Sequence, residues 1–196
     1  MDTSKGIGRQ QRETRNGHRG AVVWFTGLSG AGKTTLAHAV QERLFEAGCQ
    51  SYVLDGDNLR QGLCSDLGFS AQDRSENIRR AGETAGLLAD AGIIVLAAFI
   101  SPFNADRDRV RARLPAGDFI EVHCDCPLAV CEQRDVKGLY RRARAGEVAQ
   151  FTAISSPYEA PLHPELSLDT SRLGIADCVE QVLARLRGGG VLAPPR

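Results

Sequence analysis

The chain lacks net charge, a membrane-spanning run and a recognisable signal sequence. Its 24 lysine and arginine residues balance 24 aspartate and glutamate residues, so no overall field attracts nucleic acid or a membrane surface. No apolar run reaches the roughly 20 residues that a membrane helix needs, and the N-terminus lacks the apolar centre of a signal peptide. We therefore expect a cytoplasmic protein that binds neither membrane nor nucleic acid.

A metal centre built from cysteines is also missing. The chain has six cysteines, but Cys124-x-Cys126 is spaced more tightly than the usual zinc-binding pairs, and no second pair with histidine follows. Disulfides are rare in cytosolic proteins. We therefore expect reduced thiols rather than a zinc site or a disulfide framework.

What is present fits one compact domain. The chain has 196 residues, of which 42% are hydrophobic and 24% charged, a mixture typical of globular domains. Residues 1–20 are polar and mostly basic and are expected to form a flexible arm. Residues 21–187 are expected to form the domain, and the glycine- and proline-containing residues 188–196 a flexible tail.

Within that domain, apolar strand patterns alternate with helical ones. Strands are predicted at 21–26, 52–54, 93–100, 119–124 and 166–168. Helices are predicted at 33–47, 75–91, 105–114, 128–135 and 175–187. This alternation predicts an α/β fold with a parallel sheet between helices. The most apolar strand, 93–100, is expected at its centre, Ser75 is expected to cap its helix, and residues 136–165 are expected to form a loop or lid.

A glycine-rich motif joins the first strand to the first helix. Gly27-Leu-Ser-Gly-Ala-Gly-Lys33-Thr34 fits the pattern G-x-x-x-x-G-K-[ST] in the strand–helix context that a P-loop requires. Backbone N–H groups and the helix N-terminus would hold ATP phosphates, Lys33 would reach the β- and γ-phosphates, and Thr34 would bind Mg²⁺. The predicted fold is therefore a three-layer P-loop nucleoside-triphosphate hydrolase-like fold with a small lid. The predicted ATP-binding residues are Gly27, Ser29, Gly30, Ala31, Gly32, Lys33, Thr34 and Thr35.

Two acids follow the second strand, as Asp55-Gly-Asp57. The chain has no Asn-Lys-x-Asp guanine signature, and strand 93–100 does not end in an aspartate. Beside a P-loop, one of the two acids would orient the metal and its water, and the other would accept a hydroxyl proton. Because Asp-Gly is a common turn pair, a solvated turn is the alternative.

Basic and amide side chains follow the acids. They are Arg60, Arg74, Asn77, Arg79 and Arg80. Arg74, Asn77 and Arg80 are spaced by three and would share a helix face that meets an anion. Exposed arginines without a ligand are the alternative.

Seven segments in order resemble one family. They are Asp55-Gly-Asp-Asn-Leu-Arg60, Gly68-Phe-Ser, Asp73-Arg-Ser-Glu-Asn77-Ile-Arg-Arg80, Phe99-Ile-Ser-Pro102, Asp135-Val-Lys-Gly-Leu-Tyr140, Ala143-Arg-Ala-Gly-Glu147 and Ser156-Pro-Tyr-Glu159. Together they resemble adenylyl-sulfate kinase from about the first strand to the last. The resemblance implies that ATP and adenosine 5′-phosphosulfate give 3′-phosphoadenosine 5′-phosphosulfate and ADP, in sulfate activation. It also implies a homodimer and raises a functional link to ATP sulfurylase.

The resemblance assigns roles by position. Asp57 is implied as the candidate base near the acceptor hydroxyl, Asp55 as its metal-side partner, and Ser101 as a substrate-adjacent residue that the family marks as a phosphoenzyme site. Arg60, Arg74 and Asn77 are implied to contact the phosphosulfate. The implied adenine-stacking pair and further acceptor-site positions are Phe69 with Phe151, and Ile100, Ser101, Lys137, Ala153 and Ile154. Arg141, Arg142 and Arg144 would close over the phosphates or face solvent.

Two positions depart from the family pattern. Ala153 stands where the family usually has glycine, which matters if that site needs a positive φ, and Asn104 stands where a basic residue is frequent. Two other functions stay open. One is a small P-loop kinase for a sugar or shikimate-like acceptor, which would have no use for Phe69 and Phe151. The other is a catalytically silent nucleotide-binding module, against which the two acids argue.

Overall fold

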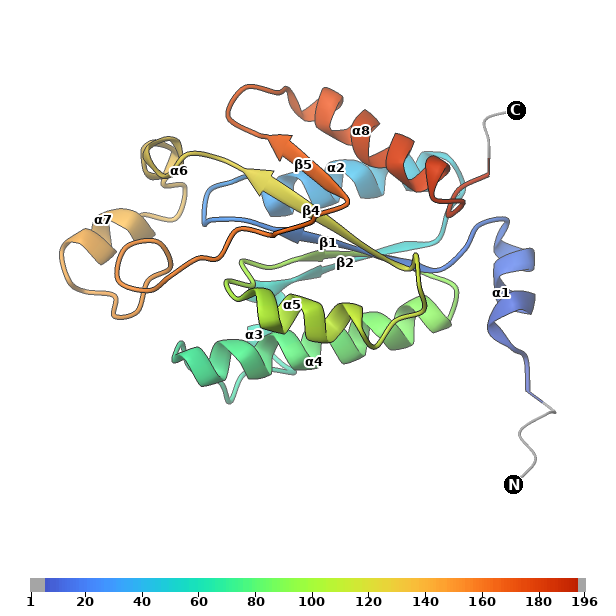
Figure 1. Ribbon diagram of the computed structural model, residues 1–196, viewed down its shortest axis with the longest axis horizontal. Coiled ribbons are helices and arrows are strands. Elements are labelled where there is room, and N and C mark those ends of the chain that lie inside the picture. Colours follow the sequence, from blue (N-terminus) through green and yellow to red (C-terminus); the bar gives the residue numbers. More distant parts are fainter. Residues whose placement is uncertain (1–5, 194–196) are drawn as a thin grey trace.

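A five-stranded, all-parallel sheet forms the middle layer of the molecule (Figure 1). The computed structural model describes residues 6–193. The strands are β1 (Ala21–Thr26), β2 (Ser51–Asp55), β3 (Ile94–Ala98), β4 (Phe119–Asp125) and β5 (Leu166–Asp169). Their spatial order is β2-β3-β1-β4-β5, so β1 is the central strand and the expectation for strand 93–100 is wrong. Both β1 and β3 are completely buried. Apolar content therefore could not decide which of the two strands is central.

Helices cover both faces of the sheet (Figure 1). Helices α2 (Lys33–Glu46) and α8 (Ile175–Gly188) cover one face, and α4 (Ala71–Asp90) and α5 (Asn104–Arg111) the other. Alternate residues of β1 point to opposite faces: Phe25 packs in the cluster that contains Leu36, and Trp24 packs in the cluster that contains Ile78. The predicted three-layer P-loop fold is confirmed.

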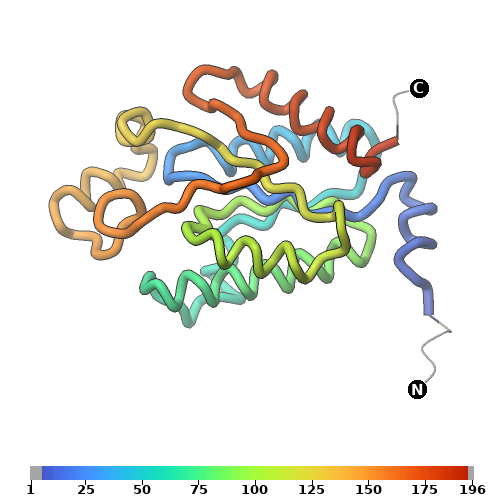
Figure 2. The backbone as a smooth tube through the Cα atoms, in the orientation of Figure 1, coloured from blue at the N-terminus to red at the C-terminus, as the bar shows by residue number. Residues whose placement is uncertain are grey.

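Three short helices gather at the carboxyl ends of the strands. They are α3 (Gly56–Arg60), α6 (Leu128–Arg134) and α7 (Leu139–Arg144). The tube in Figure 2 shows α7 and the long connection to β5 at the end of the molecule opposite the two termini. The predicted loop or lid at 136–165 therefore contains a helix.

Helix α4 begins earlier than predicted. Its N-cap is Ser70, whose hydroxyl accepts the Asp73 N–H at 3.1 Å. Ser75 lies inside the helix and its hydroxyl donates to Asp106 of α5 at 2.7 Å. The expectation of a cap at Ser75 is therefore wrong, because a serine one turn earlier already caps the helix.

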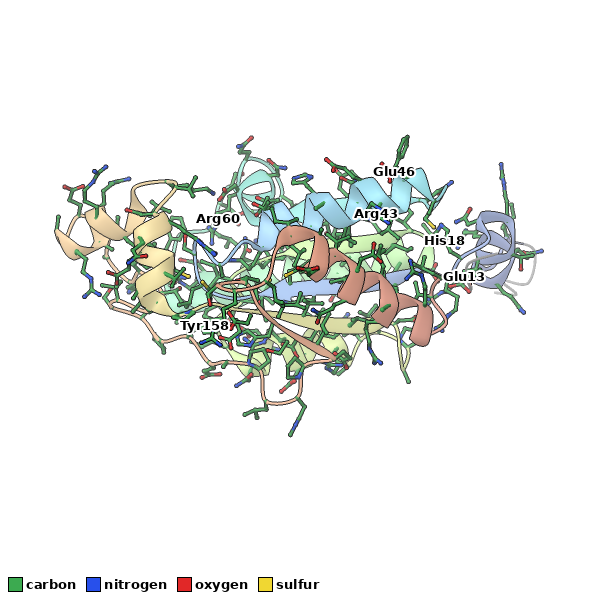
Figure 3. The ribbon with its side chains drawn as sticks, turned by 90° about the horizontal axis from the view of Figure 1, so that it is seen from above. Glu13, His18, Arg43, Glu46, Arg60 and Tyr158 are labelled. Carbon is green, nitrogen blue, oxygen red and sulfur yellow. The ribbon has the colours of Figure 1, made fainter. Side chains whose placement is uncertain are left out.

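The expected flexible arm is a docked helix over part of its length. Helix α1 (Arg9–Asn16) ends at Gly17. Arg9 pairs with the buried Asp118 at 2.5 Å, and Asn16 donates to the Gly92 carbonyl at 2.9 Å. Figure 3 labels Glu13 and His18, which lie in this N-terminal segment. Periodicity missed it because α1 buries no residue completely.

The expected flexible tail is also partly fixed. Helix α8 runs to Gly188, and Val191 is buried and accepts the Arg19 N–H at 2.9 Å. Residues 1–5 and 194–196, the ends of the predicted arm and tail, lie outside the described residues. Among residues 6–193, no helix is long and apolar enough to cross a membrane.

Candidate active site

The glycine-rich loop has backbone shapes that its glycines permit. Gly27 has φ 150°, and a Cβ there would lie 2.6 Å from the Cys124 carbonyl oxygen. Gly30 has φ 76° and lies against the Cys131 backbone. The loop leads directly into α2, whose N-terminus carries partial positive charge. Loop and helix together form the concave cradle of N–H groups that binds phosphate in P-loop proteins.

Lys33 is the first residue of α2 and is buried. Its ammonium group donates to the Leu28 carbonyl at 2.7 Å, which folds the side chain back over the loop. Burial lowers the pKa of Lys33 from its ordinary 10.5 to about 8. The next residues, Thr34 and Thr35, are exposed on the first turn of α2.

Asp55 joins the P-loop helix to the second strand. It ends β2 and caps α3: one carboxylate oxygen accepts the Asp57 N–H at 2.8 Å, and the other accepts the Thr34 hydroxyl at 2.6 Å. A hydroxyl and a carboxylate oxygen are ligands that Mg²⁺ accepts. Among residues 6–193, no group of three or more His, Cys, Asp or Glu side chains is arranged so that it could hold a metal ion. This sparse set suits an ion that takes its other ligands from water and substrate phosphates.

Asp57 faces the lid. It lies in the first turn of α3 and forms an ion pair with Lys137, which precedes α7. Both side chains are more than half exposed. The structure therefore brings together two residues that the sequence assigned to the acceptor side, next to the Thr34–Asp55 pair.

Phe69 presents an exposed ring between two arginines. Its relative exposure is 59%. The Arg60 guanidinium lies 4.3 Å from the ring centroid and that of Arg74 5.9 Å, within cation–π range. Arg60 also donates to the carbonyls of Leu67 and Gly68 at 3.1 and 2.9 Å. An aromatic face and two cations thus converge on one surface.

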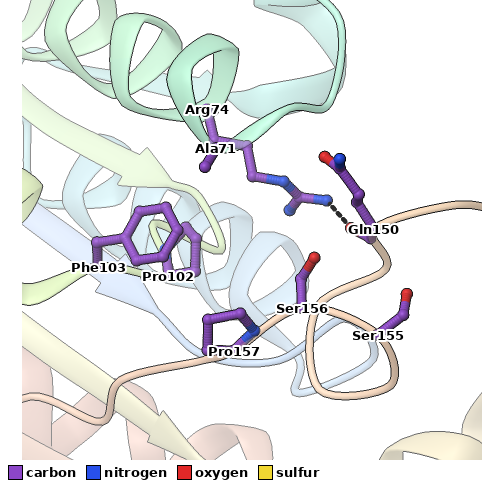
Figure 4. Close-up of a pocket in the computed structure, with 8 residues that line it drawn as sticks. All are labelled: Ala71, Arg74, Pro102, Phe103, Gln150, Ser155, Ser156 and Pro157. Atoms are coloured by element: carbon purple, nitrogen blue, oxygen red, sulfur yellow. Dashed lines mark hydrogen bonds between the residues drawn. The ribbon is translucent and has the colours of Figure 1, made fainter.

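Arg74 reaches from α4 to the lid segment (Figure 4). It donates to the Thr152 hydroxyl at 2.7 Å and to the Gln150 carbonyl. It also borders a pocket of about 260 Å³. The pocket is lined by Ala71, Arg74, Pro102, Phe103, Gln150, Ser155, Ser156 and Pro157.

Asn77 carries an amide without a partner. The residue is 4% exposed and lies one turn after Arg74 on α4, and its Nδ2 has no hydrogen-bond partner among the described residues. A buried donor without a partner costs about 1–3 kcal/mol. A buried polar group without a partner calls for an explanation, and a hydrogen bond to a bound ligand would supply one.

The Phe151 ring is buried against the lid and, unlike Phe69, presents no open face to solvent. Phe151 is 8% exposed, and its ring packs edge-on against Tyr140, with centroids 5.0 Å apart at 79°. Ala153 follows with φ 69°, the left-handed conformation that favours glycine. Ile154 is half-buried and its N–H donates to the Phe151 carbonyl at 3.1 Å.

Ser101 is buried at the end of the central strands. It has φ 41°, and its hydroxyl accepts the Trp24 indole N–H at 3.1 Å and donates to Thr26 at 3.0 Å. The carbonyl of Ile100 accepts the Thr26 hydroxyl at 2.7 Å. Tyr158, labelled in Figure 3, also contacts Thr26, and burial raises the pKa of its phenol to about 12.

Sequence reasoning missed the group that supports Ser101. Arg107 of α5 is fully buried, pairs with Glu121 at 2.6 Å and donates to the Ser101 carbonyl. It also donates to the Glu159 carbonyl at 2.8 Å, which ties the end of the lid segment to the same point. Helix α5 alternates arginines with aspartates, so charge alone did not single out Arg107.

The lid arginines are exposed in the structure. Arg142 pairs with Glu147 and Arg144 with Glu132 on the surface. No contact among the described residues joins either of them to the P-loop. Arg141, Arg142 and Arg144 all face solvent in this structure, and their closure over bound phosphates stays a prediction.

The P-loop follows the central strand β1, and the acid pair Asp55 and Asp57 follows the edge strand β2. With the basic surface around Phe69, these features define a P-loop kinase. The particular family follows from comparison with known proteins. The adenylylsulphate kinase family model matches residues 19–169. The chain belongs to the adenylylsulphate kinase family, and the predicted family and ATP-dependent kinase function are confirmed.

Relatives agree over nearly the whole chain. An adenylyl-sulfate kinase of Acaryochloris marina is 57% identical over 188 residues, which cover 96% of this chain and 92% of the relative. The APS kinase CysC of Mycobacterium tuberculosis, solved in complex with AMPPNP and APS, has a TM-score of 0.82 and 50% identity, and covers 87% of this chain and 99% of that one. A hexameric APS kinase from Thiobacillus denitrificans has a TM-score of 0.66 and 37% identity, with 90% of this chain and 30% of that chain covered.

Proposed function

We propose that the protein transfers the γ-phosphoryl group of ATP to the 3′-hydroxyl of adenosine 5′-phosphosulfate, with the site residues in the roles given below. One observation carries the assignment of roles. A chain of contacts runs from Thr34 through Asp55 to Asp57 and on to Lys137. It joins the phosphate-binding loop to the acceptor side, so a hydroxyl that contacts Asp57 lies near the end of a triphosphate held by the loop.

On the donor side, the protein binds and neutralises phosphate. Backbone N–H groups from Gly27 to Thr35 hold the triphosphate, and Lys33 exchanges the Leu28 carbonyl for phosphate oxygens. Thr34 and Asp55 would hold Mg²⁺, which supplies charge neutralisation on the β- and γ-phosphates. The hydrogen bond between these two residues places both oxygens at one point, which supports this assignment.

On the acceptor side, Asp57 accepts the proton of the 3′-hydroxyl as the new oxygen–phosphorus bond forms. The bond from the γ-phosphorus to the β–γ bridging oxygen breaks, and its electron pair leaves with ADP. Lys137, which pairs with Asp57 in this structure, moves toward the nucleotide's anionic groups when the hydroxyl takes its place. Most of the acceleration then comes from positioning and charge stabilisation.

Recognition of the acceptor uses the basic surface beside Phe69. Arg60, Arg74 and the unpartnered Asn77 amide supply donors for the phosphosulfate anion. The exposed Phe69 ring stacks on adenine in place of Arg60, and Phe151 with Ala153 and Ile154 forms the lid side of that site. Ile100 and Ser101 form its floor. Because direct transfer between two bound nucleotides suffices, Ser101 serves as a substrate-adjacent residue rather than a phosphoenzyme.

Assembly and setting are also proposals. We propose a cytoplasmic homodimer that acts in sulfate activation, in functional sequence with ATP sulfurylase, which supplies the sulfated nucleotide. Family membership supports the reaction, and the relative from Thiobacillus denitrificans is hexameric. Light scattering of the purified chain would report its oligomeric state directly.

An acceptor panel tests the proposal. The purified chain is given ATP and Mg²⁺ with adenosine 5′-phosphosulfate, adenosine monophosphate or shikimate, and ADP release is followed by a coupled assay. We expect rapid turnover with the sulfated nucleotide only, and phosphate at its 3′ position by mass spectrometry. Faster turnover with either control acceptor would refute the proposed substrate. Lys33→Ala is the matched negative control, because it removes the phosphate-binding ammonium group.

A further inference from the structure

Four consecutive carbonyls of the P-loop each accept a hydrogen bond from a side chain. Lys33 donates to Leu28 at 2.7 Å, Tyr140 to Ser29 at 2.9 Å, Arg134 to Gly30 at 3.2 Å and Thr170 to Ala31 at 3.0 Å. The four donors come from α2, α7, α6 and the residue after β5. Because the C=O and N–H of a trans peptide unit point in opposite directions, the hydrogen bond that holds the Ser29 carbonyl toward Tyr140 directs the following Gly30 N–H away from Tyr140.

Tyr140 differs from the other three donors because it also contacts the acceptor side. Its phenol binds Ser29, while its ring packs edge-on against Phe151 at a centroid distance of 5.0 Å. The side chain is buried, with 2% of its surface exposed. One rigid ring therefore spans the space between the phosphate-binding loop and the lid segment that carries Phe151.

The position of the ring is fixed from its own backbone. The Tyr140 N–H donates to one oxygen of Asp135 at 2.9 Å, and the Arg141 N–H to the other at 3.1 Å. Gly138 precedes α7 with φ 64°, which turns the chain into that helix. Movement of α7 would therefore carry the phenol away from Ser29 and the ring away from Phe151 together.

We propose that Tyr140 is a positioning residue that couples the ATP site to the acceptor site, an inference that rests on the proposed function. Binding of a triphosphate fixes the loop and with it the phenol, and the ring then holds Phe151 in the position that the acceptor base requires. Acceptor binding has the same effect in the opposite direction, because coupling between two binding sites is reciprocal.

Two substitutions separate the halves of this role. Tyr140→Phe keeps the ring and removes only the hydroxyl, so we expect the Kd for AMPPNP to rise about fivefold while acceptor affinity in the absence of nucleotide stays within about twofold of wild type. Tyr140→Leu also removes the ring contact, so both affinities should fall. Phe151→Leu, which removes that contact from the other side, should weaken acceptor binding alone.

The decisive readout is the coupling itself. Calorimetry gives the Kd for adenosine 5′-phosphosulfate with and without AMPPNP, and the ratio of the two values should move toward one in Tyr140→Phe. Tyr52→Phe, which alters an exposed tyrosine on β2, is the matched control and should leave the ratio unchanged. A Tyr140→Phe protein with wild-type AMPPNP affinity and a wild-type ratio would overturn the inference. Equal losses of affinity for both ligands in Tyr140→Phe, accompanied by a lower Tm, would also overturn it, because they would make Tyr140 merely structural. Failure of wild type to turn over the sulfated nucleotide would instead refute the proposed function.

Discussion

Lys33 combines a phosphate-binding position with an unfavourable environment for its charge. Its ammonium group is buried over the P-loop and donates a hydrogen bond to the Leu28 carbonyl. Burial lowers its pKa to about 8. A bound triphosphate would favour the charged form and raise that pKa again.

This pKa predicts a pH-dependent affinity for ATP. Below pH about 8 the lysine is charged before and after ATP binds, so affinity does not depend on this group. Above pH about 8 the free protein loses the proton, and ATP binding must take one up. The KM for ATP should therefore rise by up to about tenfold per pH unit above 8, measured at constant free Mg²⁺. Lys33→Arg, whose charge does not titrate in this range, should lose the rise. A flat KM for ATP up to pH 9.5 in wild type would contradict the assignment.

Ala153 is a residue whose backbone does not suit its side chain. Its φ of 69° costs an alanine about 1–2 kcal/mol, and the chain has alanine where the family pattern has glycine. Ala153→Gly should therefore stabilise the protein by about 0.5–1 kcal/mol after the entropy cost of glycine is subtracted, measured as a higher urea midpoint. Ala145→Gly is the control, because Ala145 has φ −74° and gains nothing from glycine. Equal destabilisation by the two substitutions would show that residue 153 carries no strain.

At the scale of elements, a helix or strand boundary could be predicted where the local sequence patterns agreed with one another. Strand β1 and helix α2 were predictable because an apolar run, a glycine loop and a helical period follow each other without a competing signal. The start of α4 was not predictable, because both Ser70 and Ser75 are residues that can cap a helix. The structure shows that Ser70 is the cap, whereas Ser75 makes a tertiary contact with Asp106. Helix α1 was missed since polar contacts, rather than an apolar face, hold it.

Those polar contacts predict a specific loss of stability. The buried Asp118 forms ion pairs with two arginines, Arg9 and Arg19. Arg9→Ala removes the first, so only Arg19, at 2.6 Å, remains paired with Asp118 among the described residues. We expect a loss of about 2 kcal/mol in the free energy of unfolding, measured in urea. Arg12→Ala is the matched control on the same helix. Its partner Asp90 is largely exposed, so its loss should stay within about 0.5 kcal/mol. Equal effects of the two changes would mean that α1 is not held through Asp118.

At the scale of the whole molecule, the parallel sheet assembles a site from distant segments. The P-loop fold and the family could be predicted, because the motifs that carry them lie in short segments that keep a recognisable pattern. The roles of the acceptor residues stay predictions. The sequence could not predict that Arg60 lies over Phe69, or that Phe151 packs behind Tyr140. The members of each pair are joined by segments of turns and bends, and the path of such a segment follows no periodic pattern in the sequence. Sequence reasoning also missed Arg107, Arg134 and Thr170, whose roles are visible only once the strands are ordered.

The central claim is that Asp57 accepts a proton from a hydroxyl held next to the phosphate on the P-loop. Single-turnover transfer from ATP to adenosine 5′-phosphosulfate by Asp57→Asn tests it most directly, with the Kd for AMPPNP measured on the same protein. We predict a rate at least about 100-fold below wild type with a Kd within about twofold of wild type. A rate close to that of wild type, or equal losses in rate and nucleotide affinity, would contradict the assignment of Asp57 as the base.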